Sequence, residues 1–186
     1  NLLNGQLQFS QQFLPTGNLS FNFPDLALLA ALAAQQADGD IAGDIALSNA
    51  NGRIAATIKA NGGSIRQGTT TISKLAADVS IDDLQALAIN GKVSADSVNA
   101  GAASISGLNA TIGHSGTTTQ FDVNGRYDNA PLVVKGSADT GGTPMTVRLD
   151  TFSAAPKGIA VRLEKPSTIA IQNGTARISD LTIITG

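Results

Sequence analysis

The single histidine of the chain lies beside a serine, which is the pairing most suggestive of nucleophilic catalysis. His114 and Ser115 stand in the short sequence Gly113–Gly116. A general base must reach its nucleophile with a third group to orient it, and sequence neighbours in a tight turn do not meet that requirement. No Gly-x-Ser-x-Gly elbow occurs either. We therefore expect His114 to be an exposed turn residue, and we expect no catalytic residue in the chain.

The acidic residues are the second place where chemistry is conceivable. Asp38, Asp40 and Asp44 surround a glycine, but the remaining oxygen ligands of a calcium loop are absent, so a solvated loop is expected. The aspartate pair at 82–83 is predicted to lie at the end of a turn. Glu164 is the only glutamate, and few aromatic residues are available to stack on sugars, which argues against a glycosidase. With no phosphate-binding motif and no cysteine, the sequence predicts neither a metal site nor a cofactor.

The composition is that of a β-rich, weakly charged protein. Charged residues make up 14% of the 186 residues, against roughly 25% in ordinary globular domains. The net charge is −2 and there is no basic run, so nucleic-acid binding is excluded as a function class. Aromatic residues are scarce at 4%, so aliphatic side chains must line any apolar interior.

The elements that would position any site are strands with alternating apolar and polar residues. A glycine recurs on the apolar side of this pattern, as at Gly43, Gly91 and Gly125. Period-two alternation places the apolar side chains on one face, and a glycine within a strand marks a bend or a close approach. We therefore predict an all-β fold, an elongated curved sheet or half-pipe with a hydrophobic concave groove, in which these glycines line the tight bends.

Thirteen strand-like runs follow one another at the spacing expected of an all-β protein. Turn signals separate them, including hairpin turns at 51–52 and at 61–63, whereas the Asn-Gly pairs at 90–91 and 124–125 lie inside the alternation. The phase of the alternation slips near Gly107 and between Ile72 and Leu75, which predicts bulges there. The predicted strands are Leu3–Phe13, Leu19–Phe23, Ile41–Ser48, Arg53–Ala60, Leu75–Ile81, Leu87–Ala95, Ser104–Ile112, Thr118–Tyr127, Pro131–Ala138, Met145–Phe152, Ile159–Leu163, Thr168–Gln172 and Arg177–Ile184.

One segment breaks the pattern. Residues 24–36 are rich in alanine and leucine, contain no β-branched residue, and begin with Pro24 and Asp25, which suit the start of a helix. We predict a short helix there, packed at the edge of the sheet. A plug or a membrane-surface helix is the alternative, but the segment has no basic residue on a polar face.

These features together resemble a known family. The strand glycines, the Pro-Asp-Leu-x-Leu-Leu-x-x-Leu segment after residues 19–23, the unit at 37–50 and the closing stretch at 166–181 are similar to the TamB family. These are the translocation and assembly module subunits, within the AsmA-like group of Gram-negative envelope proteins. The resemblance extends over essentially the whole chain and brings no catalytic residue with it.

The resemblance implies a location and partners. The chain would be a single β-rich domain, residues 1–186, within a longer protein that is anchored in the inner membrane and extends through the periplasm. An outer-membrane barrel of the Omp85 type, such as TamA, would be the partner. The groove would carry phospholipid acyl chains or chaperone unfolded strands of outer-membrane proteins.

Two other hypotheses about the function remain open from the residues alone. A structural β-helix stalk, of the adhesin or autotransporter kind, would seal the apolar face as a core. A β-solenoid enzyme, such as a polysaccharide lyase, would need clusters of carboxylates with Lys or Arg, which are not evident. The predicted groove-lining residues are Ile45, Leu47, Ile54, Ile58, Leu87, Ile89, Val93, Phe121, Val123, Val134, Val147, Leu149, Val161, Leu163, Ile169, Ile171 and Ile178.

Overall fold

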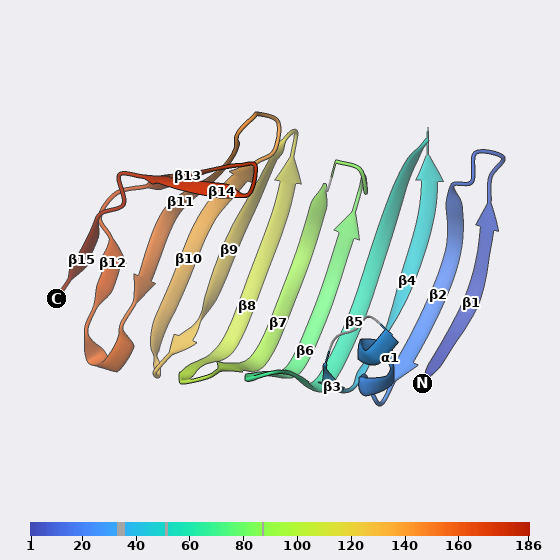
Figure 1. The fold of residues 1–186 in the computed structure, drawn as a ribbon, viewed down its shortest axis with the longest axis horizontal. Coiled ribbons are helices and arrows are strands. Elements are labelled where there is room, and N and C mark those ends of the chain that lie inside the picture. Colours follow the sequence, from blue (N-terminus) through green and yellow to red (C-terminus); the bar gives the residue numbers. More distant parts are fainter. Residues whose placement is uncertain (33–35, 51, 87) are drawn as a thin grey trace.

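A single antiparallel sheet forms the molecule (Figure 1). The computed structural model describes residues 1–32, 36–50, 52–86 and 88–186, and every strand pairing in it is antiparallel. The sheet contains 15 strands, is open rather than closed, and follows the order of the chain almost throughout. The predicted all-β fold is therefore confirmed.

Most strands belong to one up-and-down path across the sheet. It consists of β1 (Leu2–Phe9), β2 (Pro15–Phe23), β4 (Ile41–Ala50), β5 (Arg53–Gln67), β6 (Thr70–Ile81), β7 (Ile89–Ala100), β8 (Ala103–Ser115), β9 (Thr118–Tyr127), β10 (Ala130–Asp139), β11 (Met145–Ala154), β12 (Val161–Leu163) and β15 (Ile183–Thr185). Two pieces lie off this path. The two-residue β3 (Asp38–Gly39) pairs with the far end of β5, and the hairpin of β13 (Ser167–Gln172) and β14 (Thr175–Ser179) pairs with β11.

The predicted helix is present, although residues 33–35 of the predicted segment lie outside the described residues. Helix α1 is described over Ala27–Leu32, between β2 and β3, and a one-turn 3₁₀ segment occupies Pro156–Gly158. The Asp25 carboxylate accepts a hydrogen bond from the backbone N–H of Ala27 at 2.9 Å, which satisfies a donor that the first helical turn leaves free. In Figure 1, α1 lies at the lower end of β4 and β5, beside β3.

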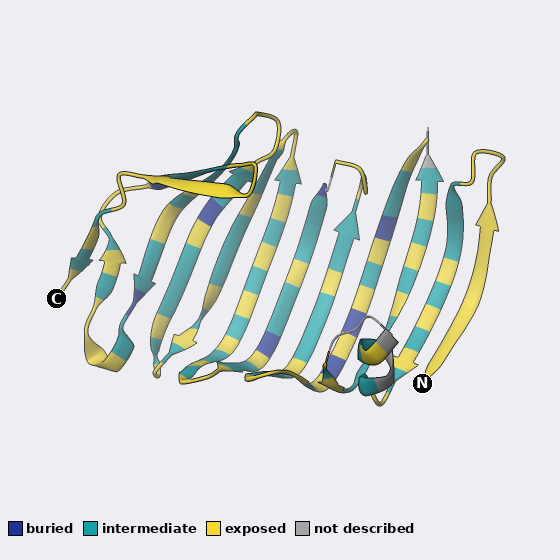
Figure 2. Ribbon diagram, viewed as in Figure 1, coloured by how far each residue is buried: buried dark blue, intermediate teal, exposed yellow. Residues whose placement is uncertain are grey.

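The sheet has no second layer over most of its extent. The accessible surface is 11555 Å², whereas a compact protein of this mass would expose about 8,300 Å². Among the described residues no large side chain is fully buried, and the buried apolar residues are alanines, such as Ala56, Ala60 and Ala95. Figure 2 shows the result, with half-buried and exposed positions alternating along strands such as β2 and β8, whereas β1 is exposed throughout. Large apolar side chains are therefore packed only against neighbours on their own face.

The predicted phase slips lie on one line across four strands. Gly63, Lys74, Asp96 and Gly107 occupy successive register positions of β5 to β8, and the regular pairing is interrupted at each of them. Lys74 and Gly107 have positive φ angles of 49° and 59°. Beyond this line the alternation of apolar and polar residues changes phase in all four strands. As a result, a further row of apolar residues lies on the same face of the sheet as the apolar residues before the line: Ile65, Ile72, Val98 and Ile105.

Several predicted element boundaries were wrong. The Asn-Gly-Gly sequence at 61–63 is not a hairpin turn but lies inside β5, and the turn to β6 follows Gln67. The Asp40 carboxylate accepts hydrogen bonds from the backbone N–H groups of Gly63 and Ser64, at 2.7 and 3.0 Å, so this irregular backbone needs no turn. The run predicted at 3–13 ends at Phe9, and the run at 177–184 divides at Asp180, where φ is +51°.

The left-handed conformation of Gly107 gives a stability prediction. A Cβ at Gly107 would meet nothing within 4 Å, so Gly107→Ala tests the backbone conformation alone. An L-residue at this φ costs about 1–2 kcal/mol, and we expect chemical denaturation to show a loss of that size. Gly113→Ala is the matched control, because it lies in the same strand, also in open space, without a positive φ. An equal loss in both variants would contradict the explanation.

Candidate functional site, an apolar sheet face

The candidate site is the apolar face of the sheet, which the register assembles from strand to strand. Directly opposed residues of antiparallel strands point to the same face. One row of opposed residues runs from β1 to β13 without a charged residue: Gly5, Leu19, Ile45, Ile58, Val79, Gly91, Ile112, Phe121, Gly136, Leu149 and Ser167.

A parallel row repeats the pattern two positions along each strand, or three on β11, where the pairing with β10 is irregular. It consists of Leu3, Phe21, Gly43, Ala60, Ala77, Val93, Ala110, Val123, Val134 and Phe152. The apolar face, as used below, is the face that carries these two rows. Strands stack about 4.8 Å apart, so the eleven members of the longer row span about 48 Å.

The predicted groove residues belong to this face wherever the structure describes them. Register and alternation assign to it Ile45, Leu47, Ile54, Ile58, Ile89, Val93, Phe121, Val123, Val134, Val147, Leu149, Val161, Leu163, Ile169, Ile171 and Ile178. Leu87 lies outside the described residues. The prediction missed other members, among them Leu19, Phe21, Val79 and Ile112, although the same alternation in the sequence points to them.

The apolar face is most exposed at the two ends of the sheet. Leu3 and Phe9 on β1 are each 62% exposed, and Ile178 on β14 is 58% exposed. Strands in the middle carry half-buried residues on this face, because each side chain there has neighbours on both sides. Apolar surface therefore continues across the sheet to both of its edges.

Glycines on this face accommodate aromatic rings from the neighbouring strand. Phe21 is opposite Gly43, and a Cβ on that glycine would come within 2.8 Å of the Phe21 Cζ atom. Phe121 is opposite Gly136 in the same way, at 2.7 Å. Such pairing of an aromatic residue with a glycine fixes the register and covers the backbone. A Cβ on Gly91 would likewise meet the backbone oxygen of Asp78 on the neighbouring strand β6.

The opposite face carries the charges. One row of opposed residues alternates in sign over much of its length: Asp44, Lys59, Asp78, Lys92, Thr111, Asp122 and Lys135. Ion pairs join Lys59 to Asp78 at 3.4 Å and Lys135 to Asp122 at 2.6 Å. The hydrogen bond from Lys135 lowers the pKa of Asp122 below its usual value of 3.8, and a hydrogen bond from Asn124 acts in the same direction. These residues define the charged face.

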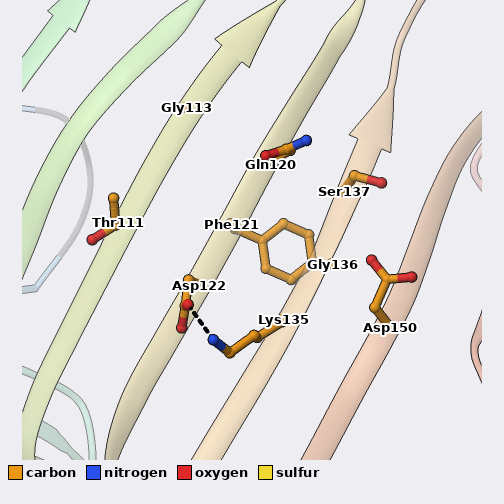
Figure 3. Close-up of a pocket in the computed structure, with 9 residues that line it drawn as sticks. All are labelled: Thr111, Gly113, Gln120, Phe121, Asp122, Lys135, Gly136, Ser137 and Asp150. Carbon is orange, nitrogen blue, oxygen red and sulfur yellow. Dashed lines mark ion pairs between the residues drawn. The ribbon is translucent and has the colours of Figure 1, made fainter.

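A shallow hollow of about 410 Å³ lies around this ion pair (Figure 3). It is lined by Thr111, Gly113, Gln120, Phe121, Asp122, Lys135, Gly136, Ser137 and Asp150. Asp122 is already paired with Lys135, and Asp150 accepts a hydrogen bond from Arg148 at 2.6 Å. The carboxylates of the hollow are thus engaged by cations of the same chain, which gives this region a structural explanation.

The interpretation of His114 as an exposed turn residue was wrong. His114 lies in β8, is half-buried, and belongs to the apolar face because it is opposite Thr119 and two residues beyond Ile112. Its Nδ1 atom lies 2.8 Å from the Thr119 hydroxyl, and its backbone N–H donates to the Asn90 side-chain oxygen at 2.7 Å. Ser115 is the next residue of the strand, and its side chain therefore points to the opposite face, away from His114.

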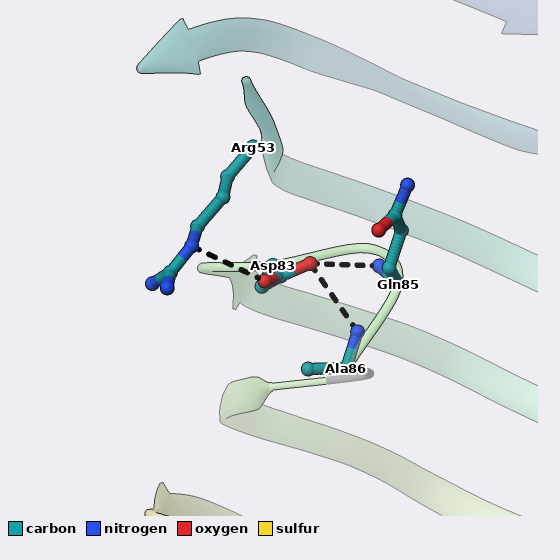
Figure 4. Close-up of polar contacts among 4 residues, drawn as sticks. All are labelled: Arg53, Asp83, Gln85 and Ala86. Atoms are coloured by element: carbon teal, nitrogen blue, oxygen red, sulfur yellow. Dashed lines mark hydrogen bonds and ion pairs between the residues drawn. The ribbon is translucent and has the colours of Figure 1, made fainter. Parts of the chain in front are cut away.

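Aspartates at the positions considered for metal binding interact with other groups of the same chain. Asp83 accepts hydrogen bonds from the backbone N–H groups of Gln85 and Ala86, at 2.9 and 3.2 Å, and these bonds close the turn between β6 and β7 (Figure 4). The same carboxylate lies 3.7 Å from the Arg53 guanidinium of β5. Asp44 accepts a hydrogen bond from Ser20. Within the described part of the chain, no group of three or more His, Asp or Glu residues is arranged to hold a metal ion.

Comparisons with known proteins identify no relative. No family model, no curated protein and no solved structure matches the chain. The resemblance to the TamB family therefore stays a prediction that rests on the sequence pattern. In the described ranges, none of the helices has the length and apolar character needed to cross a bilayer.

The Asp40 carboxylate gives a prediction on pH. The two backbone hydrogen bonds from Gly63 and Ser64 lower the pKa of Asp40 below 3.8, so its contribution to folding is present above pH 3.8 and is lost as the pH falls through the lowered value. We expect Asp40→Ala to melt at a lower temperature than the parent at pH 7, with the difference shrinking below pH 3.8.

Asp38→Ala is the control for the pH prediction. Asp38 is an exposed acid two residues away, on β3, so its removal changes the net charge equally. A melting difference for Asp40→Ala that persists unchanged at acid pH would contradict the role assigned to the carboxylate.

Proposed function

We propose that this chain is a non-enzymatic segment that binds phospholipid acyl chains along its apolar face. The single observation that supports the proposal is the uncharged row that crosses eleven strands of a sheet which, in its described residues, has no second layer over most of its extent. Exposed apolar patches of this extent usually mark binding sites. The row spans about 48 Å, more than the roughly 30 Å hydrocarbon thickness of a bilayer, so acyl chains can lie along it end to end.

The chemistry of a sheet face favours lipid over unfolded polypeptide as the ligand. The backbone N–H and C=O groups of the inner strands are already used in the sheet, so the face offers apolar side chains and few polar groups. A polypeptide laid across it would bring its own backbone polar groups out of water without partners, at a cost of about 1–3 kcal/mol each. An acyl chain has no such groups. Chaperoning of outer-membrane protein strands is therefore the second candidate.

The location and partners follow from the resemblance alone. In the proposal, the chain is a periplasmic part of an inner-membrane-anchored TamB-type protein, and its partner is an Omp85-type outer-membrane barrel such as TamA. Two features speak against the alternative of a structural β-helix stalk. The described strands pair antiparallel in chain order rather than in parallel coils, and they leave their large apolar side chains only half-buried.

A charge placed on the apolar face tests the proposal. Val123 belongs to the second row, on β9 between Ala110 of β8 and Val134 of β10, and Val123→Asp would bring a carboxylate against the acyl chain. We expect binding of a fluorescent phospholipid to weaken by about tenfold or more, since 1.4 kcal/mol corresponds to a factor of ten. The measurement is a fluorescence titration of the purified chain.

Gln120→Asp is the matched control. It introduces the same charge in the same strand, but Gln120 is exposed on the charged face, opposite Ser137 and Gly113. Circular dichroism establishes that both variants keep their strands. Unchanged lipid binding by Val123→Asp, or equal weakening by Gln120→Asp, would reject the apolar face as the binding site.

Photo-crosslinking in cells identifies the ligand. A crosslinking amino acid at Ile58 or Val93 should capture phospholipid, whereas one at Lys59 or Lys92, on the charged face, should not. Capture of outer-membrane protein from the apolar positions in place of lipid would favour the second candidate. Equal capture from both faces would contradict a binding role for the apolar face.

A further inference from the structure

His114, the only histidine of the chain, places an imidazole on the apolar face. It belongs to a third row of opposed residues, two positions along each strand from the first row, and within that row it is opposite Thr119. The other members of the third row are aliphatic residues and a glycine: Leu7, Gly17, Leu47, Ala56, Ile81, Ile89, Ala138, Val147 and Ile169.

The His114–Thr119 pair lies at the rim of the sheet. Strand β8 ends one residue after the histidine, at Ser115, and β9 begins at Thr118, so the turn between the two strands is close by (Figure 1). Both side chains of the pair are half-buried. A molecule bound at this position can therefore have one end at the sheet margin, in water, and the rest against apolar side chains.

The pair keeps a hydrogen-bond donor free. The imidazole Nδ1 atom lies 2.8 Å from the Thr119 hydroxyl oxygen, and in the described part of the chain the Nε2 atom has no partner. If the hydroxyl donates to Nδ1, the neutral ring carries its hydrogen on Nε2; if Nδ1 donates, the hydroxyl hydrogen is free instead. A protonated ring offers both donors and a positive charge. In each state the pair can donate to a ligand on the apolar face.

A bound acyl chain would make this free donor costly. Hydrocarbon lying over the pair would remove water from it without supplying an acceptor, and a polar group buried without a partner is unfavourable. Among the described residues no acid forms an ion pair with His114, whereas Lys59 and Lys135 on the charged face are each paired with an aspartate. An anionic oxygen that belongs to the ligand would supply the missing acceptor.

We infer that His114 and Thr119 bind the headgroup phosphate of a phospholipid whose acyl chains lie on the apolar face; this inference rests on the proposed function. Beyond the pair, the third row continues over six strands to β1 and over three strands to β13. At about 4.8 Å per strand these distances are about 29 and 14 Å. One leaflet of a bilayer, half of the hydrocarbon thickness, is about 15 Å, so apolar surface of acyl-chain length is present on both sides of the pair.

Two lipids that differ only in the phosphate test the inference. We expect the purified chain to bind a fluorescent phosphatidic acid about tenfold more tightly than the diacylglycerol with the same acyl chains and fluorophore, because a site that hydrogen-bonds a group discriminates against an analogue without it. His114→Leu should abolish this preference and leave diacylglycerol binding equal or stronger. Thr119→Val, which replaces only the hydroxyl, should reduce the preference. Fluorescence titration measures each affinity.

Tyr127→Phe is the matched control. Tyr127 lies on the same face as Thr119, at the other end of β9, where it is opposite Ile105 and Ala130. The substitution also removes one hydroxyl from the apolar face, but it should leave the preference for phosphatidic acid unchanged. Circular dichroism establishes that the variants keep their strands. Val123→Asp should weaken the binding of both lipids.

Nuclear magnetic resonance identifies the group that receives the phosphate, since a single histidine gives one set of imidazole signals. Phosphatidic acid should shift these signals. Inorganic phosphate at the same concentration should not, because it lacks the acyl chains that hold the headgroup in place.

Three results would overturn the inference. They are equal affinity of the unmodified chain for the two lipids, an undiminished preference in His114→Leu, and an imidazole shift as large with inorganic phosphate as with phosphatidic acid. Binding of neither lipid would reject the proposed function and this inference together. Equal binding of both lipids would reject this inference alone.

Discussion

The structure depends on an antiparallel ladder that keeps its register across eleven strands. Because opposed residues share a face, a single misplaced residue would move the side chains of the rest of that strand to the wrong side. The register is held where it is most at risk. Phe21 over Gly43 and Phe121 over Gly136 fit only one alignment of their strands, and a shifted alignment would separate the ion pairs of the opposite face, such as Lys59 with Asp78.

The bulge line across β5 to β8 shows how this register tolerates an irregularity. If one strand alone changed phase, its apolar residues would point into water while those of its neighbours did not. Here Gly63, Lys74, Asp96 and Gly107 interrupt four neighbouring strands at the same level, so the four strands change phase together. The Lys74–Asp96 ion pair, at 2.7 Å, spans two of them and raises the pKa of Lys74. The apolar face therefore continues past the irregularity.

Local patterns predicted the strands and the two faces, because the alternation of apolar and polar residues can be recognised within each strand separately. They failed where a residue distant in sequence decides the outcome. The Asn-Gly-Gly segment at 61–63 has the composition of a turn, but Asp40, more than twenty residues earlier, satisfies its backbone N–H groups within a strand. His114 was misjudged for a related reason. Its glycine neighbours indicated a turn, although its position two residues after Ile112 fits the alternation of β8.

The polar and the apolar residues of the chain are segregated onto opposite faces of the sheet. The chain has few charged residues, and the two rows that define the apolar face contain none of them. On the charged face they stand opposite one another in cross-strand pairs. A globular protein would cover such a face with a second layer of structure. Here the middle of the face carries many alanines and glycines, whose side chains are small. Their small size keeps the face low and continuous between the larger aliphatic side chains. A flexible hydrocarbon chain can follow such a surface without needing a hydrogen-bonding partner, whereas a folded protein partner would need a matching shape.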